Sequence, residues 1–251
     1  MGIKISKAVI IVNLLKPEAG ELVEEIKNYL EKKNITFKVF AYSGKPISPK
    51  VKNADMAFAI GGDGTVLFCA RTLASREIPV LAVNMGNFGF ITEVSKDEWK
   101  ETFDDYVAGK LSVSKRLMLK VSVFRNEKIV RSFYSLNDAV ISAYGISKMI
   151  RLSVELDDTP LGMYRADGII VATPTGSTAY SAAAGGPLLE PDMDALLLNP
   201  ICPFSLSNRP LVIDSKKRIN VFVDKDQRAD IILTIDGQTV FPLKEDDRVV
   251  F

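Results

Sequence analysis

The chain has 251 residues, of which 47% are hydrophobic and 25% charged, and this length is enough for one large globular domain or two ordinary ones. The formal net charge is +1 and no run of basic residues stands out, so nucleic acid is not expected as a partner. The chain contains no histidine, which excludes Ser-His-Asp, Cys-His and His-metal chemistry and leaves carboxylates as the leading general bases for a hydroxyl substrate.

The N-terminal apolar run of about eight residues is too short for a signal-peptide core or a membrane span. We therefore expect a cytoplasmic protein without a membrane partner. The two cysteines, Cys69 and Cys202, lie far apart in the sequence and in apolar surroundings. A buried thiol is expected at each position, rather than a disulfide or a zinc ligand.

Strand and helix patterns alternate along the first part of the chain, which predicts a parallel α/β domain. The helix expected over residues 17–33 has Pro17 near its start and Leu22, Ile26 and Leu30 on one side. Gly109 is expected to cap the last helix of this part. The other expected elements are strands over 8–13, 37–42, 56–60 and 80–84 and helices over 66–74 and 96–108.

After Gly109 the apolar pattern changes to strict alternation, as in 117–123, 150–156, 219–223 and 231–235, and this predicts a mostly-β domain. We expect a boundary between Gly109 and Ser114, with an α/β domain over 1–110 and a β-rich domain over 111–251. No Pro/Gly/Ser-rich linker marks the change. Two closely packed domains with a ligand cleft between them are therefore expected.

The run Gly61-Gly62-Asp63-Gly64-Thr65 follows a short apolar strand and precedes a helix-like segment. Glycines allow positive φ and leave backbone N–H groups uncovered, and a helix start adds partial positive charge, so such a turn can hold phosphate oxygens. A carboxylate inside a phosphate cradle suggests phosphoryl transfer. A β-hairpin turn is disfavoured by the helical spacing downstream, whereas an ordinary strand-to-helix loop stays an open alternative.

Three further motifs are weaker when each is taken alone. Residues 167–181 form an apolar strand, a Thr/Pro/Gly/Ser turn and the start of a helix of small residues, which suits phosphate or ribose but also suits an ordinary capped helix. The 84–90 turn contains two glycines, and Asn137-Asp138 interrupts an apolar strand pattern. Simple turn chemistry is the default interpretation of these two.

In this order, however, the motifs closely resemble the NAD kinase family. The resemblance covers roughly residues 8 to 240, and it includes Pro200-Ile201-Cys202-Pro203 and Asp236-Gly237-Gln238. Gly-Gly-Asp-Gly-Thr is also shared with lipid kinases, but the Thr-Pro-Thr-Gly-Ser-Thr-Ala-Tyr run from Thr173 is close to diagnostic.

The resemblance implies a kinase that transfers a phosphoryl group from ATP or polyphosphate, with Mg²⁺, to the 2′-hydroxyl of the adenosine ribose of NAD, giving NADP. It also implies a Rossmann-like parallel α/β domain followed by a β-sandwich-like domain, and a homodimer or homotetramer. A lipid kinase and a non-catalytic NAD- or NADP-binding sensor are the alternatives.

Carried over by position, Asp63 corresponds to the proton acceptor, and no residue is assigned as a metal ligand. This chain has Asp138 where the family more often has Glu, and Phe204 where many relatives have His. It ends at Phe251, before the basic and apolar tail of relatives. The resemblance assigns nucleotide contacts to Gly61, Gly62, Gly64, Thr65, Phe90, Asn137, Asp138, Lys148, Arg165, Asp167, Thr178, Ala179, Tyr180, Ser181, Ala182, Ala183 and Gln238.

Overall fold

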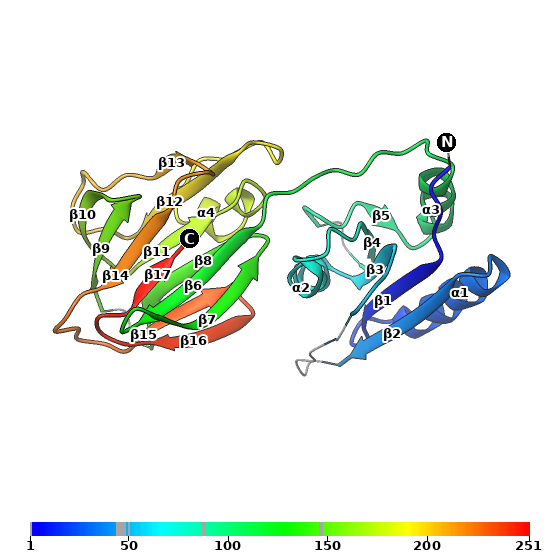
Figure 1. Cartoon of the computed structure of the whole chain (residues 1–251), viewed down its shortest axis with the longest axis horizontal. Helices are drawn as coiled ribbons and strands as arrows, with labels where there is room; N and C mark the ends of the chain where they lie inside the picture. The colour runs from blue at the N-terminus through cyan, green and yellow to red at the C-terminus, as the bar shows by residue number, and fades with distance from the viewer. Residues whose placement is uncertain (1, 44–48, 50, 87–88, 146–147) are drawn as a thin grey trace. The chain divides into compact units, whose positions relative to one another are not determined.

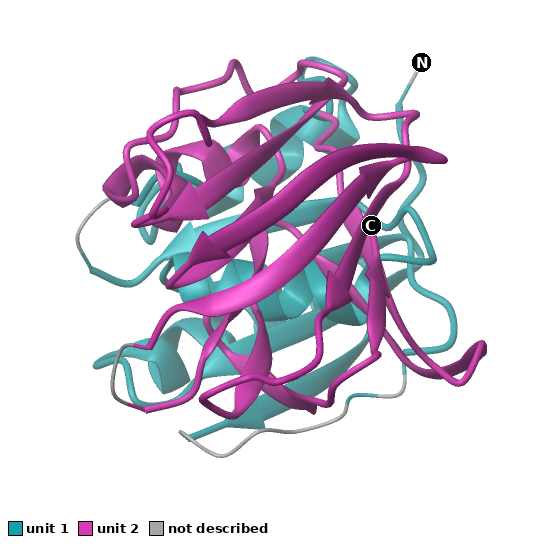
Figure 2. Cartoon of the chain, turned by 90° about the vertical axis from the view of Figure 1, so that its left-hand side faces the viewer, with its two compact units in different colours: residues 1–114 teal, residues 115–251 magenta. Residues whose placement is uncertain are grey.

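The computed structural model describes residues 2–43, 49, 51–86, 89–145 and 148–251. The chain divides into two compact units, residues 1–114 and residues 115–251, which Figure 2 draws in teal and magenta. The division expected from the change of pattern falls at 110/111, in the stretch that follows the last helix of the first unit. Two residues of the 84–90 turn, Asn87 and Phe88, lie outside the described residues.

The first unit contains a five-stranded sheet in which every neighbouring pair of strands is parallel (Figure 1). Its strands are β1 (Lys7–Asn13), β2 (Thr36–Tyr42), β3 (Met56–Gly61), β4 (Val80–Asn84) and β5 (Val94–Ser95). The spatial order β2-β1-β3-β4-β5 is a doubly wound order, which confirms the expected Rossmann-like α/β unit. The order reverses between β1 and β3, and sheets of this kind bind ligands beside that reversal, at the carboxyl ends of their strands.

Helices cover both faces of this sheet. α1 (Ala19–Lys32) and α3 (Trp99–Val107) pack in one apolar cluster with side chains of β1, β3 and β4. α2 (Asp63–Leu73) contacts the same strands without joining that cluster, so it covers the opposite face. Both α1 and α3 are shorter than expected. α1 begins after Glu18, whose φ of 61° is not helical, and α3 ends before Gly109, whose φ of 76° suits a glycine C-cap.

The start of α2 differs from the sequence expectation in a way that matters for function. The apolar pattern placed the helix over 66–74, but it begins at Asp63. Gly62 is extended at the N-cap, and its carbonyl accepts the first helical bond from the N–H of Thr65 at 2.8 Å. The first turn contains polar and small residues only, so its periodicity gave no signal.

The second unit is built from two six-stranded antiparallel sheets, as expected for a β-sandwich. The first sheet has the order β10-β9-β14-β17-β6-β7 and contains β6 (Leu119–Arg125), β7 (Lys128–Ser135), β9 (Ile150–Leu156), β10 (Thr159–Ala166), β14 (Ile219–Val223) and β17 (Arg248–Val250). The second sheet has the order β13-β12-β11-β8-β15-β16 and contains β8 (Asp138–Ala143), β11 (Gly168–Ala172), β12 (Ala195–Ile201), β13 (Leu211–Asp214), β15 (Ile231–Ile235) and β16 (Thr239–Leu243).

The alternating residues of the two sheets fill one core between them. Val121, Leu152 and Val221 of the first sheet pack in the same buried cluster as Ile141 and Leu233 of the second. In β6, β9 and β15, less buried positions alternate with the core residues, which is why the period of two was visible in the sequence. β6 begins at Leu119, two residues later than the alternation suggested.

The second sheet is also covered on its outer face, because Val140, Ile170 and Leu197 form a separate buried cluster there with Ala184 and Leu189. The covering segment was expected to be a helix of small residues. It is instead a short 3₁₀ turn, Thr175–Thr178, followed by the four-residue helix α4 (Tyr180–Ala183), and neither element has a side-chain cap.

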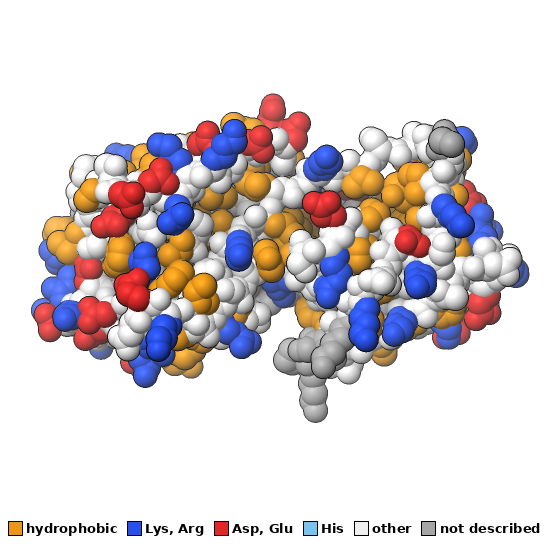
Figure 3. Space-filling model, viewed as in Figure 1, with side chains coloured by type: hydrophobic (Ala, Val, Ile, Leu, Met, Phe, Trp, Pro, Cys, Tyr) orange, Lys and Arg blue, Asp and Glu red, His pale blue; other side chains and the backbone are white. Residues whose placement is uncertain are grey.

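The cysteine expectation is confirmed for Cys69 and wrong for Cys202. Burial in α2 raises the pKa of the Cys69 thiol to about 12, whereas Cys202 follows β12 in an exposed position with a φ of 45°. Among the described residues, no helix is long and apolar enough to cross a membrane. On the face drawn in Figure 3, lysine and arginine are interspersed with aspartate and glutamate, in keeping with the small net charge.

Candidate active site

Asp63 lies at the carboxyl edge of the first sheet, directly after β3 and beside the reversal of strand order between β1 and β3. As the first residue of α2, it places a carboxylate at the positive end of the helix dipole. A Cβ atom on Gly61 would stand 2.1 Å from Thr65 Oγ1, so this position requires glycine. The Thr65 hydroxyl is buried and shares a 3.1 Å hydrogen bond with the Tyr42 hydroxyl.

The carboxylate of Asp63 is held by the loop that leads to β5. Its Oδ2 accepts the backbone N–H of Phe90 at 3.0 Å, and its Oδ1 accepts the N–H of Ile91 at 3.4 Å and the hydroxyl of Thr92 at 2.9 Å. A Cβ on Gly89 would stand 2.0 Å from Oδ1, so a residue with a side chain at position 89 would clash with the carboxylate. This contact joins Asp63 to residues that lie 26 to 29 positions further along the sequence.

Two exposed side chains complete this edge of the first unit. Phe90 donates its backbone N–H to Asp63, and its side chain is 75% exposed. Lys16 follows β1, and its Nζ would be 3.9 Å from a Cβ on Gly86. The first unit therefore brings a glycine-rich turn, a carboxylate, an aromatic ring and a cation to one edge of its sheet.

In the second unit, Asp236 organises the segment in which the chain passes from β7 to β8. Its carboxylate accepts the Ser135 hydroxyl at 2.5 Å and the backbone N–H groups of Leu136, Asn137 and Asp138 at 2.8–3.3 Å. The interrupted strand pattern at Asn137-Asp138 is thus a passage between the two sheets, fixed by a residue about 100 positions away.

Asp138 is a buried residue with 4% of its surface exposed. Burial, and secondarily the charge of Asp236, raises the pKa of Asp138 from its ordinary value to about 7. A carboxyl that titrates near neutrality in the protein interior is a common feature of ligand-binding and catalytic sites.

The 173–178 turn packs directly on this passage. Thr173 donates its hydroxyl to the Leu136 carbonyl at 2.5 Å, and a Cβ on Gly176 would stand 2.0 Å from the Asn137 carbonyl oxygen. The hydroxyls of Ser177 and Thr178 donate to the backbone of the turn itself. Of the next residues, Tyr180 is exposed, and Ser181 is buried against Asn199.

The remaining assigned residues of the second unit lie at the opposite end of the β8–β11 pair. Asp138 pairs with Ala172, whereas Asp167 lies beyond the Gly168–Ser142 pair. The six residues of β8 separate its ends by about 17 Å at about 3.3 Å per residue. We call Asn137, Asp138 and Gln238 the near-end group and Lys148, Arg165 and Asp167 the far-end group.

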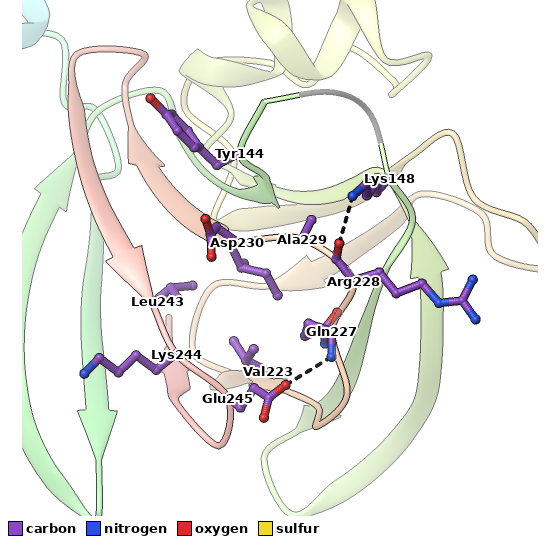
Figure 4. A pocket seen from close by; sticks show the side chains of 11 residues that line it. Tyr144, Lys148, Val223, Gln227, Arg228, Ala229, Asp230, Leu243, Lys244 and Glu245 are labelled. Carbon is purple, nitrogen blue, oxygen red and sulfur yellow. Dashed lines mark hydrogen bonds between the residues drawn. The ribbon is translucent and has the colours of Figure 1, made fainter.

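Lys148 of the far-end group borders a cavity of about 630 Å³ and donates to the carbonyl of Arg228 at 3.2 Å (Figure 4). The guanidinium of Arg165 stacks 4.8 Å from the centre of the Phe204 ring. The structure therefore does not bring all the assigned residues of the second unit into one place within a single chain.

The first unit is a doubly wound sheet with a carboxylate and a glycine-rich helix start at its switch point. The second unit is a β-sandwich with its own cluster of polar residues held in place by hydrogen bonds. These features together are those of a nucleotide-using phosphotransferase. Comparisons with known proteins agree. Residues 47–111 match the family model "ATP-NAD kinase N-terminal domain", and residues 136–251 match "ATP-NAD kinase C-terminal domain".

The chain is 44% identical to an NAD kinase of Treponema denticola over 245 residues, which is 97% of this chain and 86% of that protein. The crystal structure of an NAD kinase from Archaeoglobus fulgidus in complex with ATP has a TM-score of 0.77 and 26% identity, covering 98% of this chain and 89% of that one. The yeast NADH kinase complexed with NADH shares the fold, with a TM-score of 0.85 at 24% identity, over 98% of this chain and 78% of that one.

The chain belongs to the NAD kinase family, and it is an enzyme that transfers a phosphoryl group to NAD.

Sequence reasoning missed three residues of this region: Thr92, which contacts Asp63, and Asp236 and Ser135, which fix the near-end group. Asp236 was read only as part of a motif. Nothing local in the sequence indicates its four donors, because they lie about 100 positions away, where the chain passes from β7 to β8.

Proposed function

We propose that this enzyme transfers the terminal phosphoryl group of ATP to the 2′-hydroxyl of the adenosine ribose of NAD, giving NADP and ADP. Family membership supports the substrates. The observation that carries the chemistry is the Asp63 carboxylate, fixed by the 89–92 loop at the first residue of α2. Phosphoryl transfer needs positioned reactants, charge neutralisation and an oriented hydroxyl, and little covalent help from the protein.

The phosphates of ATP are proposed to bind at the 61–65 turn. The N-terminus of α2 offers backbone N–H groups and a positive dipole end there, and Gly62 and Gly64 leave that backbone uncovered. Lys16 adds a positive charge at the same edge. Mg²⁺ would be carried by the phosphates, because this ion usually keeps several waters and takes only one or two carboxylates.

Asp63 is proposed to orient the 2′-hydroxyl and accept its proton during attack on phosphorus. A carboxylate is the appropriate base in a chain without histidine, and a positioned base typically contributes about 10²- to 10⁴-fold in rate. Phe90, whose backbone N–H donates to this carboxylate, has an exposed ring that offers a flat apolar surface for a base of the nucleotide.

The NAD adenosine is proposed to bind the near-end group and the neighbouring 178–183 segment. Asn137 offers an amide, Asp138 a titrating carboxyl and Tyr180 an exposed ring, and these suit a ribose and an adenine better than an acyl chain. This set distinguishes the proposal from a lipid kinase, which would need a long apolar channel.

We also propose that the enzyme works in the cytoplasm as a homodimer or homotetramer. The far-end group supports a multimer, because it lies about 17 Å from the near-end group at about 3.3 Å per residue and so stays available to complete the site of another copy. Light scattering at micromolar concentration is expected to give at least twice the monomer mass of 27.6 kDa. A monomer in the active preparation would contradict this part of the proposal.

The test of function is a coupled assay in which an NADP-specific dehydrogenase reports NADP formed from NAD. ATP with Mg²⁺ is expected to support turnover at about 1–100 s⁻¹, the usual range for kinases. Inorganic polyphosphate is supplied in a parallel reaction, and a sphingoid base replaces NAD in another. Consumption of ATP with the sphingoid base and none with NAD would overturn the proposed function in favour of a lipid kinase.

A further inference from the structure

Thr92 is a buried residue of the first unit, and its side chain contacts the Asp63 carboxylate. It is fully buried, although it carries a hydroxyl, and it donates to Asp63 Oδ1 at 2.9 Å. Asn84, at the end of β4, is also buried and lies behind it, with its Nδ2 3.2 Å from Thr92 Oγ1 and 3.3 Å from the Thr92 carbonyl oxygen. Buried polar groups in such a network are held more firmly than exposed ones.

The hydrogen atoms of this network have one consistent direction. The backbone N–H of Gly86 can only donate, so the atom of Asn84 that it meets at 2.8 Å is the amide oxygen. The other amide atom of Asn84 is then the nitrogen, which donates to Thr92 Oγ1. Thr92 must direct its own hydrogen elsewhere, and the carboxylate of Asp63 accepts it.

The same contacts decide which oxygen of Asp63 is left for the substrate. A carboxylate has about four acceptor positions, two on each oxygen. Oδ1 accepts from both Ile91 and Thr92, whereas Oδ2 accepts only from Phe90 among the described residues. As far as the described residues go, one acceptor position of Oδ2 is therefore open.

We propose that Thr92 is a positioning residue for phosphoryl transfer: its hydroxyl, oriented by Asn84, holds Asp63 Oδ1 so that Oδ2 takes the proton of the substrate hydroxyl. In the step itself, the 2′-oxygen bonds to phosphorus, the phosphorus–oxygen bond to ADP breaks, and the hydroxyl proton passes to Oδ2. This inference rests on the proposed function, because it concerns the same reaction.

The test compares Thr92→Val, which keeps the shape and removes the hydroxyl, with Thr92→Ser, which keeps the hydroxyl. Because a misdirected base affects the chemical step, Thr92→Val is expected to lower kcat about tenfold while KM for NAD and for ATP changes less than about twofold. Thr92→Ser is expected to stay within about threefold of the wild-type kcat. Should Thr92→Val not fold, Thr92→Ala replaces it, since alanine and serine differ only by the hydroxyl.

Thr72→Val is the matched control, because Thr72 lies in α2 and its hydroxyl donates to the backbone carbonyl of Phe68. It is expected to keep the wild-type kcat. A double-mutant cycle adds the decisive comparison: if Thr92 acts through Asp63, Asp63→Asn with Thr92→Val should be no slower than Asp63→Asn alone, within about twofold.

An unchanged kcat in Thr92→Val, a serine variant as slow as the valine variant, or the same tenfold loss in the Asp63→Asn background would each overturn the positioning role. In those cases the wild type and Thr72→Val still form NADP, so the proposed function stands. Absence of NADP from the wild type and from Thr72→Val would overturn the proposed function and this inference together.

Discussion

Asp63→Asn is expected to lower kcat for NADP formation by about 10²- to 10⁴-fold, because an amide cannot accept the proton of the substrate hydroxyl. The Kd for NAD should change less than about threefold, since the residue acts in the chemical step. Asp63→Asn should also lower the free energy of unfolding slightly. The amide that replaces the carboxylate accepts through one atom only, so it cannot serve both Phe90 on one oxygen and Thr92 on the other. Steady-state kinetics and calorimetric titration with NAD measure the two effects.

Asp97→Asn is the matched control, since Asp97 is an exposed carboxylate of the same unit, and it should keep the wild-type kcat. If Asp63→Asn turns over within about threefold of the wild type, a carboxylate base at position 63 is excluded. If turnover is lost together with NAD binding and with the thermal transition, the residue is structural.

Asp138→Asn is expected to stabilise the protein at alkaline pH. The pKa of Asp138 rises from 3.8 to about 7 in the folded chain because the carboxyl is buried, and secondarily because Asp236 is near. The folded state therefore holds this proton more tightly than the unfolded state. Its contribution to stability is complete below about pH 4 and is lost as the pH rises through 7.

Asparagine does not ionise, so the Asp138→Asn variant does not lose stability through this group as the pH rises. Its advantage in free energy of unfolding should grow by about 2–3 kcal/mol between pH 5 and pH 8.5. Urea unfolding of both proteins at the two pH values measures this, with the exposed Asp158→Asn as the control that shows no such trend. A pH-independent difference would mean that Asp138 is ionised in the folded protein throughout this range.

The same titration bears on selectivity between substrate and product. Above pH 7 the charged Asp138 should repel the 2′-phosphate of NADP, whereas a 2′-hydroxyl can donate a hydrogen bond to it. We expect the ratio of the NADP and NAD dissociation constants to rise more steeply with pH in the wild type than in Asp138→Asn, where the second ionisation of the 2′-phosphate is the only one of these two groups left. Parallel changes for both ligands would remove Asp138 from discrimination.

The elements with regular apolar periods were predictable from sequence. The 3.6-residue period of Leu22, Ile26 and Leu30 gave α1, and the alternation of the later strands gave the sandwich, because one face of each element is buried and the other is not. The strand-to-helix position of Asp63 was predictable for the same reason: apolar segments stand on both sides of it.

The contacts that fix the candidate site were not predictable, because they join residues distant in sequence. Thr92 lies 29 positions from Asp63, and Asp236 lies about 100 positions from the backbone it holds. Cys202 stands among apolar residues in the sequence, yet the strand ends just before it and the chain turns outward. The α4 segment reads as a helix, but after four helical residues the chain turns at Gly185, whose φ is 79°.

The most direct test of 2′-phosphorylation with Asp63 as the base is a ³¹P NMR spectrum of the wild-type enzyme mixed with NAD, ATP and Mg²⁺. We expect a new phosphomonoester resonance from the 2′ position of the adenosine ribose, equal in amount to the ADP released, and its absence over the same period with Asp63→Asn. ADP release without this resonance, or the same resonance formed equally fast by Asp63→Asn, would contradict this expectation.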